Sequence, residues 1–259
     1  MLILLPPSEN KRVPARGRPV DLGSLVCPEL SPAREQVLHA LTVASARPDA
    51  TDVLKVSSAL ADQVAANTGV YRAATAPAAQ VYQGVLYEAA GLAEISGTAR
   101  RRANRHVRIA SALWGILSPN DRIPAYRLSM TAALPGVAPL AAFWARHLTG
   151  VFDPAGRDVV VDCRSGAYAP AWSPARGRPW ITVRVVAIRN GRPKVVSHHA
   201  KHARGVLAGH LLRRAEPMPR TVQQVLEAAS ELVGTFARDV LLHPAKGKGP
   251  DTLEIVLAD

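Results

Sequence analysis

Residues 111–130 read SALWGILSPNDRIPAYRLSM, and this stretch says more about the fold than any other part of the chain. It mixes aromatic, charged and proline residues and keeps neither a helical nor a strand period throughout. Pro119 and Pro124 restrict the backbone around them and so fix where the neighbouring polar side chains point. Polar groups on a stiff loop beside apolar strands are typical of a binding or catalytic surface, although a buried turn with an arginine–aspartate pair fits equally well.

Working outward, apolar and β-branched runs predict the strands, and capped amphipathic runs predict the helices. Strands are expected at 1–5, 107–117, 124–130 and 158–163, in a hairpin around Asn190-Gly191, and in a pair at 233–244 and 251–258. Helices are expected at 31–46 (with Ser31 as the cap), 52–56, 58–67, 98–105, 139–148, 200–214 and 221–230. The sequence therefore predicts one α+β (mixed α/β) domain over residues 1–259, a mixed sheet flanked by helices, with a small helical insertion near 50–75.

Composition places the chain among ordinary globular proteins with an excess of positive charge. Hydrophobic residues make up 48% of the chain, and 32 Lys and Arg outnumber 20 Asp and Glu, which gives a formal net charge of +12. A protein this basic is expected to meet polyanions such as nucleic acid or phosphorylated metabolites.

Cysteine usage and hydropathy indicate the compartment. Cys27 and Cys163 are far apart and no CxxC occurs, so no cysteine zinc site and no metal is expected. No run reaches the ~20 apolar residues that a membrane span needs, and the first residues lack the basic start of a signal peptide. We expect a cytoplasmic protein with reduced thiols and no membrane contact. No Walker loop or GxGxxG supports a nucleotide cofactor, and none is predicted.

Several short segments carry candidate functional groups. Ser8, Glu9 and Lys11 follow the first strand, where α/β proteins place ligands. Lys201 and Arg204 are three residues apart on a predicted helix whose neighbours are small, including Gly205. Segment 162–168, DCRSGAY, follows a buried strand and is expected at the same sheet edge as the first loop. It offers Cys163 as a nucleophile, although a core cysteine fits as well.

Two further features have ordinary and functional interpretations. The basic run at 100–108 adjoins the central block and suits phosphate contact, although such runs are usually solvated faces. His198 and His202 have the i, i+4 spacing of metal ligands, but no carboxylate lies between them, so the zinc-protease pattern is absent.

Five blocks in this order resemble the YaaA family of peroxide stress proteins. They are LLPPSENK at 4–11, VYQGVLY at 81–87, residues 111–130, VVVDCRSGAYAPAW at 159–172 and KVVSHHAKHARG at 194–205. The resemblance implies a single-domain α/β fold of unusual topology with a positively charged cleft, a helix–hairpin–helix-like element near 50–75, and binding to DNA. It also implies a role in peroxide stress, where the family is linked to low levels of unincorporated iron. The expected hairpin at 56–58, VSS, holds no glycine.

Two hypotheses follow. In the first, a basic cleft binds DNA through non-specific phosphate contacts and helps to limit iron-driven oxidative damage; the anion-binding candidates are Ser8, Lys11, Arg122, Tyr126, Arg127, Arg164, Ser165, Lys201 and Arg204. In the second, an enzyme acts on a small anionic or nucleotide-like substrate in the same cleft, with Glu9, Lys11, Tyr126, Cys163 and Lys201 as catalytic candidates. A weaker third hypothesis is iron binding by His198, His199 and His202.

Overall fold

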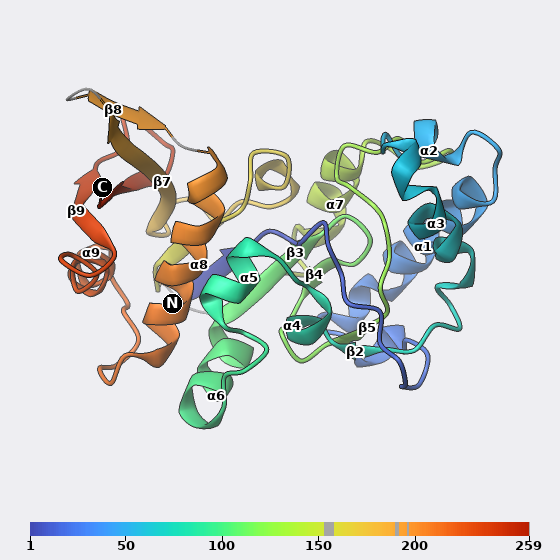
Figure 1. Cartoon of the computed structure of the whole chain (residues 1–259), viewed down its shortest axis with the longest axis horizontal. Coiled ribbons are helices and arrows are strands. Elements are labelled where there is room, and N and C mark those ends of the chain that lie inside the picture. Colours follow the sequence, from blue (N-terminus) through green and yellow to red (C-terminus); the bar gives the residue numbers. More distant parts are fainter. Residues whose placement is uncertain (153–157, 190–191, 196, 259) are drawn as a thin grey trace.

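The computed structural model describes residues 1–152, 158–189, 192–195 and 197–258. In this part of the chain one large mixed sheet runs in the order β4-β3-β1-β6-β7-β10-β9, with β8 paired to β7 (Figure 1). Its strands are β1 (Leu2–Leu5), β3 (Val107–Ser111), β4 (Gly115–Leu117), β6 (Val160–Asp162), β7 (Trp180–Arg189), β8 (Arg192–Val195), β9 (Ala237–His243) and β10 (Asp251–Leu257). A small second sheet pairs β2 (Ala76–Pro77) with β5 (Arg122–Ile123).

The central strands are parallel. β1 pairs in parallel with β3 and β6, and β7 pairs in parallel with β6 and β10, whereas β4, β8 and β9 are antiparallel to their neighbours. Every residue of β1 is buried, because helices and neighbouring strands cover it on all sides. The predicted mixed α/β class is therefore confirmed.

Helices surround this sheet. They are α1 (Ser31–Ser45), α2 (Ala50–Val53), α3 (Ala61–Ala65), α4 (Ala78–Val81), α5 (Val85–Ala90), α6 (Gly97–His106), α7 (Leu140–Leu148), α8 (Ser197–Arg213) and α9 (Val222–Ser230). α8 packs on β7 and against α5, and Figure 1 shows α1, α2 and α3 grouped at the opposite end of the molecule from the C-terminus. The short helices α2 and α3 occupy the predicted insertion near 50–75.

The order of the strands creates a place for a ligand. From β1 the chain continues to β3 on one side, whereas from β6 it continues to β7 on the other side. The loops that leave the carboxyl ends of these adjacent strands therefore diverge. A crevice at such a reversal is where open α/β sheets bind ligands.

Three local predictions were wrong. The expected strand at 107–117 is a hairpin of β3 and β4, because Ser111 Oγ accepts the backbone amides of Leu113 (3.2 Å) and Trp114 (3.1 Å) and closes a turn. The expected strand at 124–130 has no strand partner, because the Asn67 side chain binds both backbone groups of Arg127. The third concerns Ser31, which lies inside α1 and not at its cap, because its hydroxyl donates to the carbonyls of Leu22 and Pro28.

The other strand and helix predictions agree with the structure within a few residues. Helix 139–148 appears as α7, helix 200–214 as most of α8, and the pair at 233–244 and 251–258 as β9 and β10. The Asn190-Gly191 turn lies outside the described residues, and the strands on either side of it, β7 and β8, pair as predicted.

Candidate functional site at the carboxyl edge of the sheet

Hydrogen bonds within the protein hold the loop that follows β1. The amide of Arg12 donates to the carbonyl of Val81 at 2.8 Å, and the amide of Gln83 donates to the carbonyl of Asn10 at 3.1 Å. Ser8 Oγ donates to the Gln83 carbonyl, and the Tyr87 hydroxyl donates to the Pro6 carbonyl at 2.7 Å. The predicted anion ligand Ser8 therefore anchors this loop.

Lys11 occupies the centre of the site. Its Nζ donates to the backbone carbonyls of Ser8 (2.8 Å) and Glu9 (3.4 Å) and lies 4.2 Å from the centre of the Tyr126 ring. Two carbonyls and a ring face can satisfy the three N–H groups of an ammonium. Burial nevertheless lowers the pKa of Lys11 to about 7, while nearby Glu9 opposes this effect and Arg127 adds to it. Lys11 thus exchanges its proton near neutral pH.

A chain of hydroxyl groups lies beneath Lys11. The Tyr126 hydroxyl hydrogen-bonds with the Tyr82 hydroxyl at 2.8 Å and with Ser111 Oγ at 2.8 Å. All three residues are buried, and burial raises the pKa of Tyr126 and of Tyr82 well above the usual range. Both phenols therefore stay protonated, so Tyr126 presents a ring face and a bonded hydroxyl to the site.

An ion pair forms the outer wall of the site. Arg127 donates to the Glu9 carboxylate (Nη2 to Oε2, 3.2 Å) and to the Glu9 carbonyl (Nη1, 3.1 Å). The Arg127 side chain is 13% exposed and that of Glu9 is 50% exposed. A guanidinium sunk in the surface and covered by an exposed carboxylate is an anion site that already holds an internal anion. We call Glu9, Lys11, Tyr82, Ser111, Tyr126 and Arg127 the Lys11 cluster.

The loop after β6 lies beside this cluster, as its sequence position predicted. Glu9, Arg127 and Tyr126 all influence the pKa of the buried Tyr168 hydroxyl, which burial raises far above its usual value. Within the described part of the chain this hydroxyl has no hydrogen-bond partner of ordinary geometry, although the Met130 amide is near enough to lower its pKa slightly. Tyr168 is therefore a buried polar group next to the cluster.

Arg164 and Cys163 have structural environments. Arg164 is buried and donates to the Asp162 carboxylate at 2.9 and 2.7 Å and to the carbonyls of Tyr168 and Trp172. These bonds occupy the guanidinium group, and the role of Arg164 as an anion ligand stays a prediction. Burial raises the pKa of Cys163 to about 12, against the effect of nearby Arg204. A neutral, fully buried thiol is a poor nucleophile.

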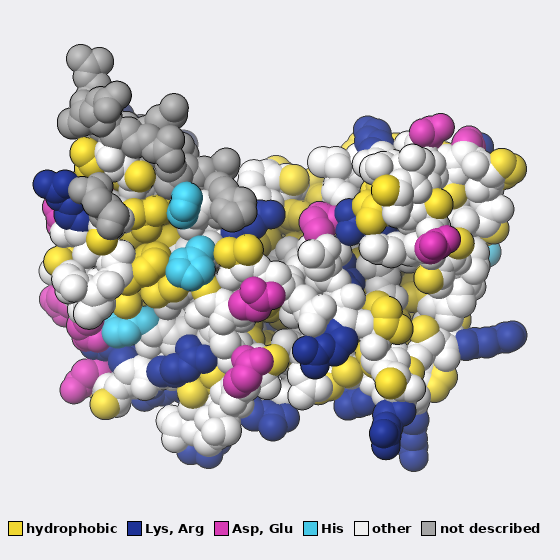
Figure 2. All heavy atoms as spheres, viewed as in Figure 1, with side chains coloured by type: hydrophobic (Ala, Val, Ile, Leu, Met, Phe, Trp, Pro, Cys, Tyr) yellow, Lys and Arg dark blue, Asp and Glu magenta, His cyan; other side chains and the backbone are white. Residues whose placement is uncertain are grey.

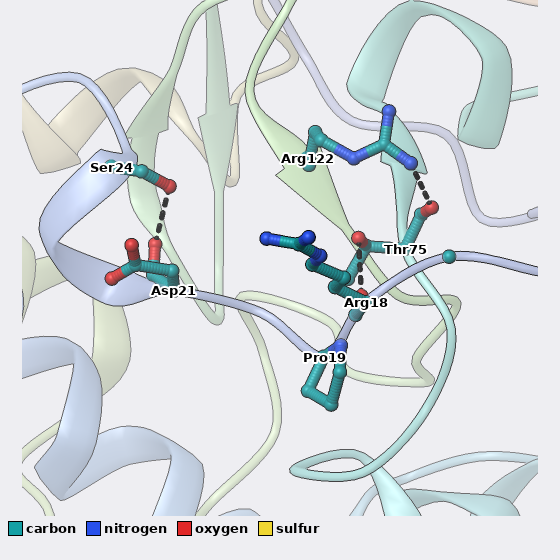
Figure 3. Close-up of a pocket in the computed structure, with 7 residues that line it drawn as sticks. Arg18, Pro19, Asp21, Ser24, Thr75 and Arg122 are labelled. Carbon is teal, nitrogen blue, oxygen red and sulfur yellow. Dashed lines mark hydrogen bonds between the residues drawn. The ribbon is translucent and has the colours of Figure 1, made fainter.

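In the part of the chain that the structure describes, the remaining candidates make no hydrogen bond or ion pair with the cluster. Arg204 donates to the carbonyl of Val183 at 2.9 and 3.2 Å, Lys201 is exposed on α8, and half-buried Ser165 accepts the Tyr168 amide with its backbone carbonyl. Arg122 donates to the carbonyl of Thr75 at 2.6 Å and lines a separate cavity of about 450 Å³ with Arg18, Pro19, Asp21 and Ser24 (Figure 3).

Two residues outside the candidate set also hold the central block in place. The buried Asp121 carboxylate accepts the backbone amides of Val26 (3.1 Å) and Ser118 (2.9 Å), and burial raises its pKa. Asn67, which the sequence suggested as a helix stop, is buried and positions Arg127. A polar residue inside an otherwise apolar turn was the available signal for Asn67, but its partner is not visible in the sequence.

Surface charge on the face in Figure 2 gathers along the lower margin, where Lys and Arg side chains outnumber acidic ones. Among the described residues there is no group of three His, Cys, Asp or Glu side chains placed to hold a metal ion, and His198 lies outside the described side chains. None of the described helices has the length and apolar character needed to cross a bilayer.

The fold and the cluster define an α/β protein with a cationic polar site at the carboxyl ends of its parallel strands. The family model described as "Peroxide stress protein YaaA" matches residues 1–229. The chain therefore belongs to this family, and its expected role in peroxide stress is supported.

Relatives cover almost the whole chain. A UPF0246 protein of Streptomyces coelicolor is 39% identical over 260 residues, which is 99% of this chain and 98% of the relative. A UPF0246 protein of Corynebacterium efficiens is 40% identical over 214 residues, covering 80% of this chain and 83% of that protein.

Proposed function

We propose that this peroxide-stress protein binds the phosphate groups of DNA at the Lys11 cluster and so helps to limit iron-driven damage. The observation that carries the proposal is the Arg127–Glu9 pair, in which an exposed carboxylate covers a nearly buried guanidinium. A phosphate of the DNA backbone can replace that carboxylate. The carboxylate is planar and the phosphate tetrahedral, but both are oxyanions that accept two N–H bonds from one guanidinium group. The net charge of +12 adds long-range attraction for a polyanion.

The Arg127–Glu9 pair allows a test in which two substitutions should change DNA affinity in opposite directions. Glu9→Gln removes the internal competitor, so affinity for a labelled duplex should rise, whereas Arg127→Gln should lower it for all sequences alike. The exposed Arg47–Asp49 pair provides matched controls, because Arg47→Gln and Asp49→Asn change the same charges outside the cluster. Fluorescence anisotropy across a salt series should give a log–log slope of about −0.9 for each phosphate neutralised. Equal effects at both pairs would reject the site, and a flat salt response would reject phosphate binding.

The link to iron damage has its own experiment. Ferrous iron reduces hydrogen peroxide to hydroxide and a hydroxyl radical, being oxidised to ferric iron, and the radical breaks DNA where the iron was bound. A protein that occupies backbone phosphates displaces ferrous ions from them. Supercoiled plasmid exposed to both reagents should be nicked less with the wild-type chain than with Arg127→Gln. Equal protection by the two proteins would show that protection does not depend on the Lys11 cluster.

A second candidate function is catalysis on a small anionic substrate, and the position of Lys11 favours it. A lysine that titrates near neutral pH against a tyrosine ring is suited to proton transfer. The Glu9→Gln variant distinguishes the two functions. Under the catalytic hypothesis it should bind inorganic phosphate more tightly than the wild type does, while its affinity for duplex DNA stays unchanged.

A further inference from the structure

A second charged hollow lies at the opposite edge of the sheet. It encloses about 590 Å³ and is lined by Met1, Leu2, Arg105, His106, Arg108, Asp158, Arg178 and Arg220. These residues lie where parallel strands begin: Leu2 opens β1, Arg108 is the second residue of β3, and Asp158 and Arg178 precede β6 and β7. Because the Lys11 cluster lies where such strands end, the two sites are at opposite edges. We call this second site the amino-edge hollow.

Positive charge dominates the hollow. Among the residues that the structure describes, four guanidinium groups line the hollow beside one carboxylate, that of Asp158. This carboxylate accepts from the Met1 ammonium at 2.8 Å and from Arg220 Nε at 3.1 Å. His106 does not offset this excess, since it is neutral or positive; burial lowers its pKa, and the Met1 ammonium and Arg105 contribute. Such a concentration of cations around one acid attracts a multiply charged anion.

Two of the arginines bind backbone carbonyls, and the other two have exposed side chains. Arg108 Nη1 donates to the carbonyls of Asn104 (2.9 Å) and Val107 (2.7 Å), and Arg178 Nε donates to the carbonyl of Asp158 (3.0 Å). The Arg108 guanidinium group carries five N–H donors, more than its two carbonyl bonds use. Arg105 and Arg220 are exposed, and the Arg220 side chain retains 77% of its accessibility. Half-buried cations beside exposed ones suit a ligand that enters from solvent.

The size and chemistry of the hollow narrow the class of ligand. Its volume lies within the range of ~300–1,000 Å³ that is usual for small-molecule sites. Guanidinium groups bind phosphate oxygens in pairs, and several of them together match two linked phosphates better than one. Asp158 is the internal anion that an entering phosphate would displace from Arg220. We propose that the amino-edge hollow binds a small ligand that carries a pyrophosphate group.

Isothermal titration of the full chain with inorganic pyrophosphate at low salt tests this directly. The wild type should bind, and the double variant Arg105→Gln/Arg220→Gln should bind at least about tenfold more weakly, because it loses two charged donors to the phosphate oxygens. Both changes are at exposed side chains, so folding should persist, which circular dichroism will verify. Arg47→Gln/Arg72→Gln removes two exposed arginines elsewhere and should bind like the wild type. Asp158→Asn should bind more tightly, since it removes the internal competitor.

Wild-type affinity in the Arg105→Gln/Arg220→Gln protein would overturn the proposal, as would an equal loss in the control. The Arg127→Gln variant keeps this inference separate from the proposed function, because it should lose DNA affinity and keep pyrophosphate binding. Competition identifies the ligand class. Displacement of pyrophosphate by a nucleoside diphosphate, but not by a short duplex at equal phosphate concentration, supports a small ligand. Displacement by the duplex alone would make the hollow a nucleic-acid contact and overturn the proposal.

Discussion

The side-chain amide of Asn67 pairs with both backbone groups of Arg127, although the two residues are 60 positions apart. Its Nδ2 donates to the Arg127 carbonyl at 2.9 Å, and its Oδ1 accepts the Arg127 amide at 2.8 Å. The second hydrogen of Nδ2 goes to Ser45 Oγ at 3.1 Å. Asn67 thus substitutes for a neighbouring strand beside residues 124–130, and it sets the position from which Arg127 reaches Glu9.

Replacement of Asn67 should affect both stability and binding. Asn67→Ala leaves the two Arg127 backbone groups and Ser45 Oγ without their partner in a buried place, which should cost ~1–3 kcal/mol in the free energy of unfolding. Duplex affinity should fall as well, because Arg127 loses its support. Denaturant unfolding and anisotropy measure the two effects, with exposed Asn120→Ala as the control. Full duplex affinity in a folded Asn67→Ala protein would contradict the positioning role.

Lys11 should titrate far below other lysines. Reductive methylation with ¹³C-formaldehyde followed by NMR should show one dimethylamine resonance that moves with a midpoint at a pH of about 7. Lys11→Met should remove this resonance, whereas Lys201→Met should not, since Lys201 is exposed. A Lys11 midpoint above pH 10 would contradict the lowered pKa. It would show that the two carbonyls and the Tyr126 ring keep Lys11 protonated despite its burial.

The same shift has a consequence for stability. The unfolded chain keeps the Lys11 proton up to about 10.5, whereas the folded chain releases it near 7. Between these values the unfolded state binds more protons, so the free energy of unfolding rises with pH in that window. Denaturant unfolding at intervals from pH 7 to 10 should show this rise in the wild type and a smaller one in Lys11→Met. Parallel profiles for the two proteins would refute the lowered pKa.

Much of this architecture was predictable because it depends on local sequence. The buried run at 1–5, the paired runs around β7 and β8 and the amphipathic helix at 140–148 each carry their period within a single segment. The strand ends also predicted that Ser8, Glu9 and Lys11 would meet the loop after β6. The partner of Arg127 was not predictable, because Glu9 is 118 positions away in the sequence, whereas Arg164 pairs with Asp162, only two positions away.

Loss of a buried tyrosine hydroxyl in the cluster should cost more stability than loss of a tyrosine hydroxyl at the surface. Tyr126→Phe removes the oxygen that joins Tyr82 to Ser111, leaving both with a broken bond inside the protein, so it should cost ~1–3 kcal/mol. Tyr71→Phe removes a hydroxyl that binds the more exposed Glu35 carboxylate at 2.6 Å, and water can replace that bond. Its cost should stay below ~1 kcal/mol. Thermal and denaturant unfolding measure the stability lost by each variant. Equal losses would show that the buried hydroxyl chain stabilises the protein no more than an exposed hydrogen bond does.

The glycine of the 200–205 segment should resist replacement for a reason of packing. A Cβ at Gly205 would lie 2.3 Å from the carbonyl oxygen of Leu86 and 2.8 Å from the Ala89 side chain, so the close approach there is made by helix α5. Alanine in a helix interior normally gains ~1 kcal/mol over glycine. Gly205→Ala should instead destabilise the protein by ~1–3 kcal/mol, because α5 and α8 must separate. Gly69→Ala is the control, since a Cβ there meets nothing within 4 Å. A Gly205→Ala protein as stable as Gly69→Ala in denaturant unfolding would show that the two helices have room to move apart.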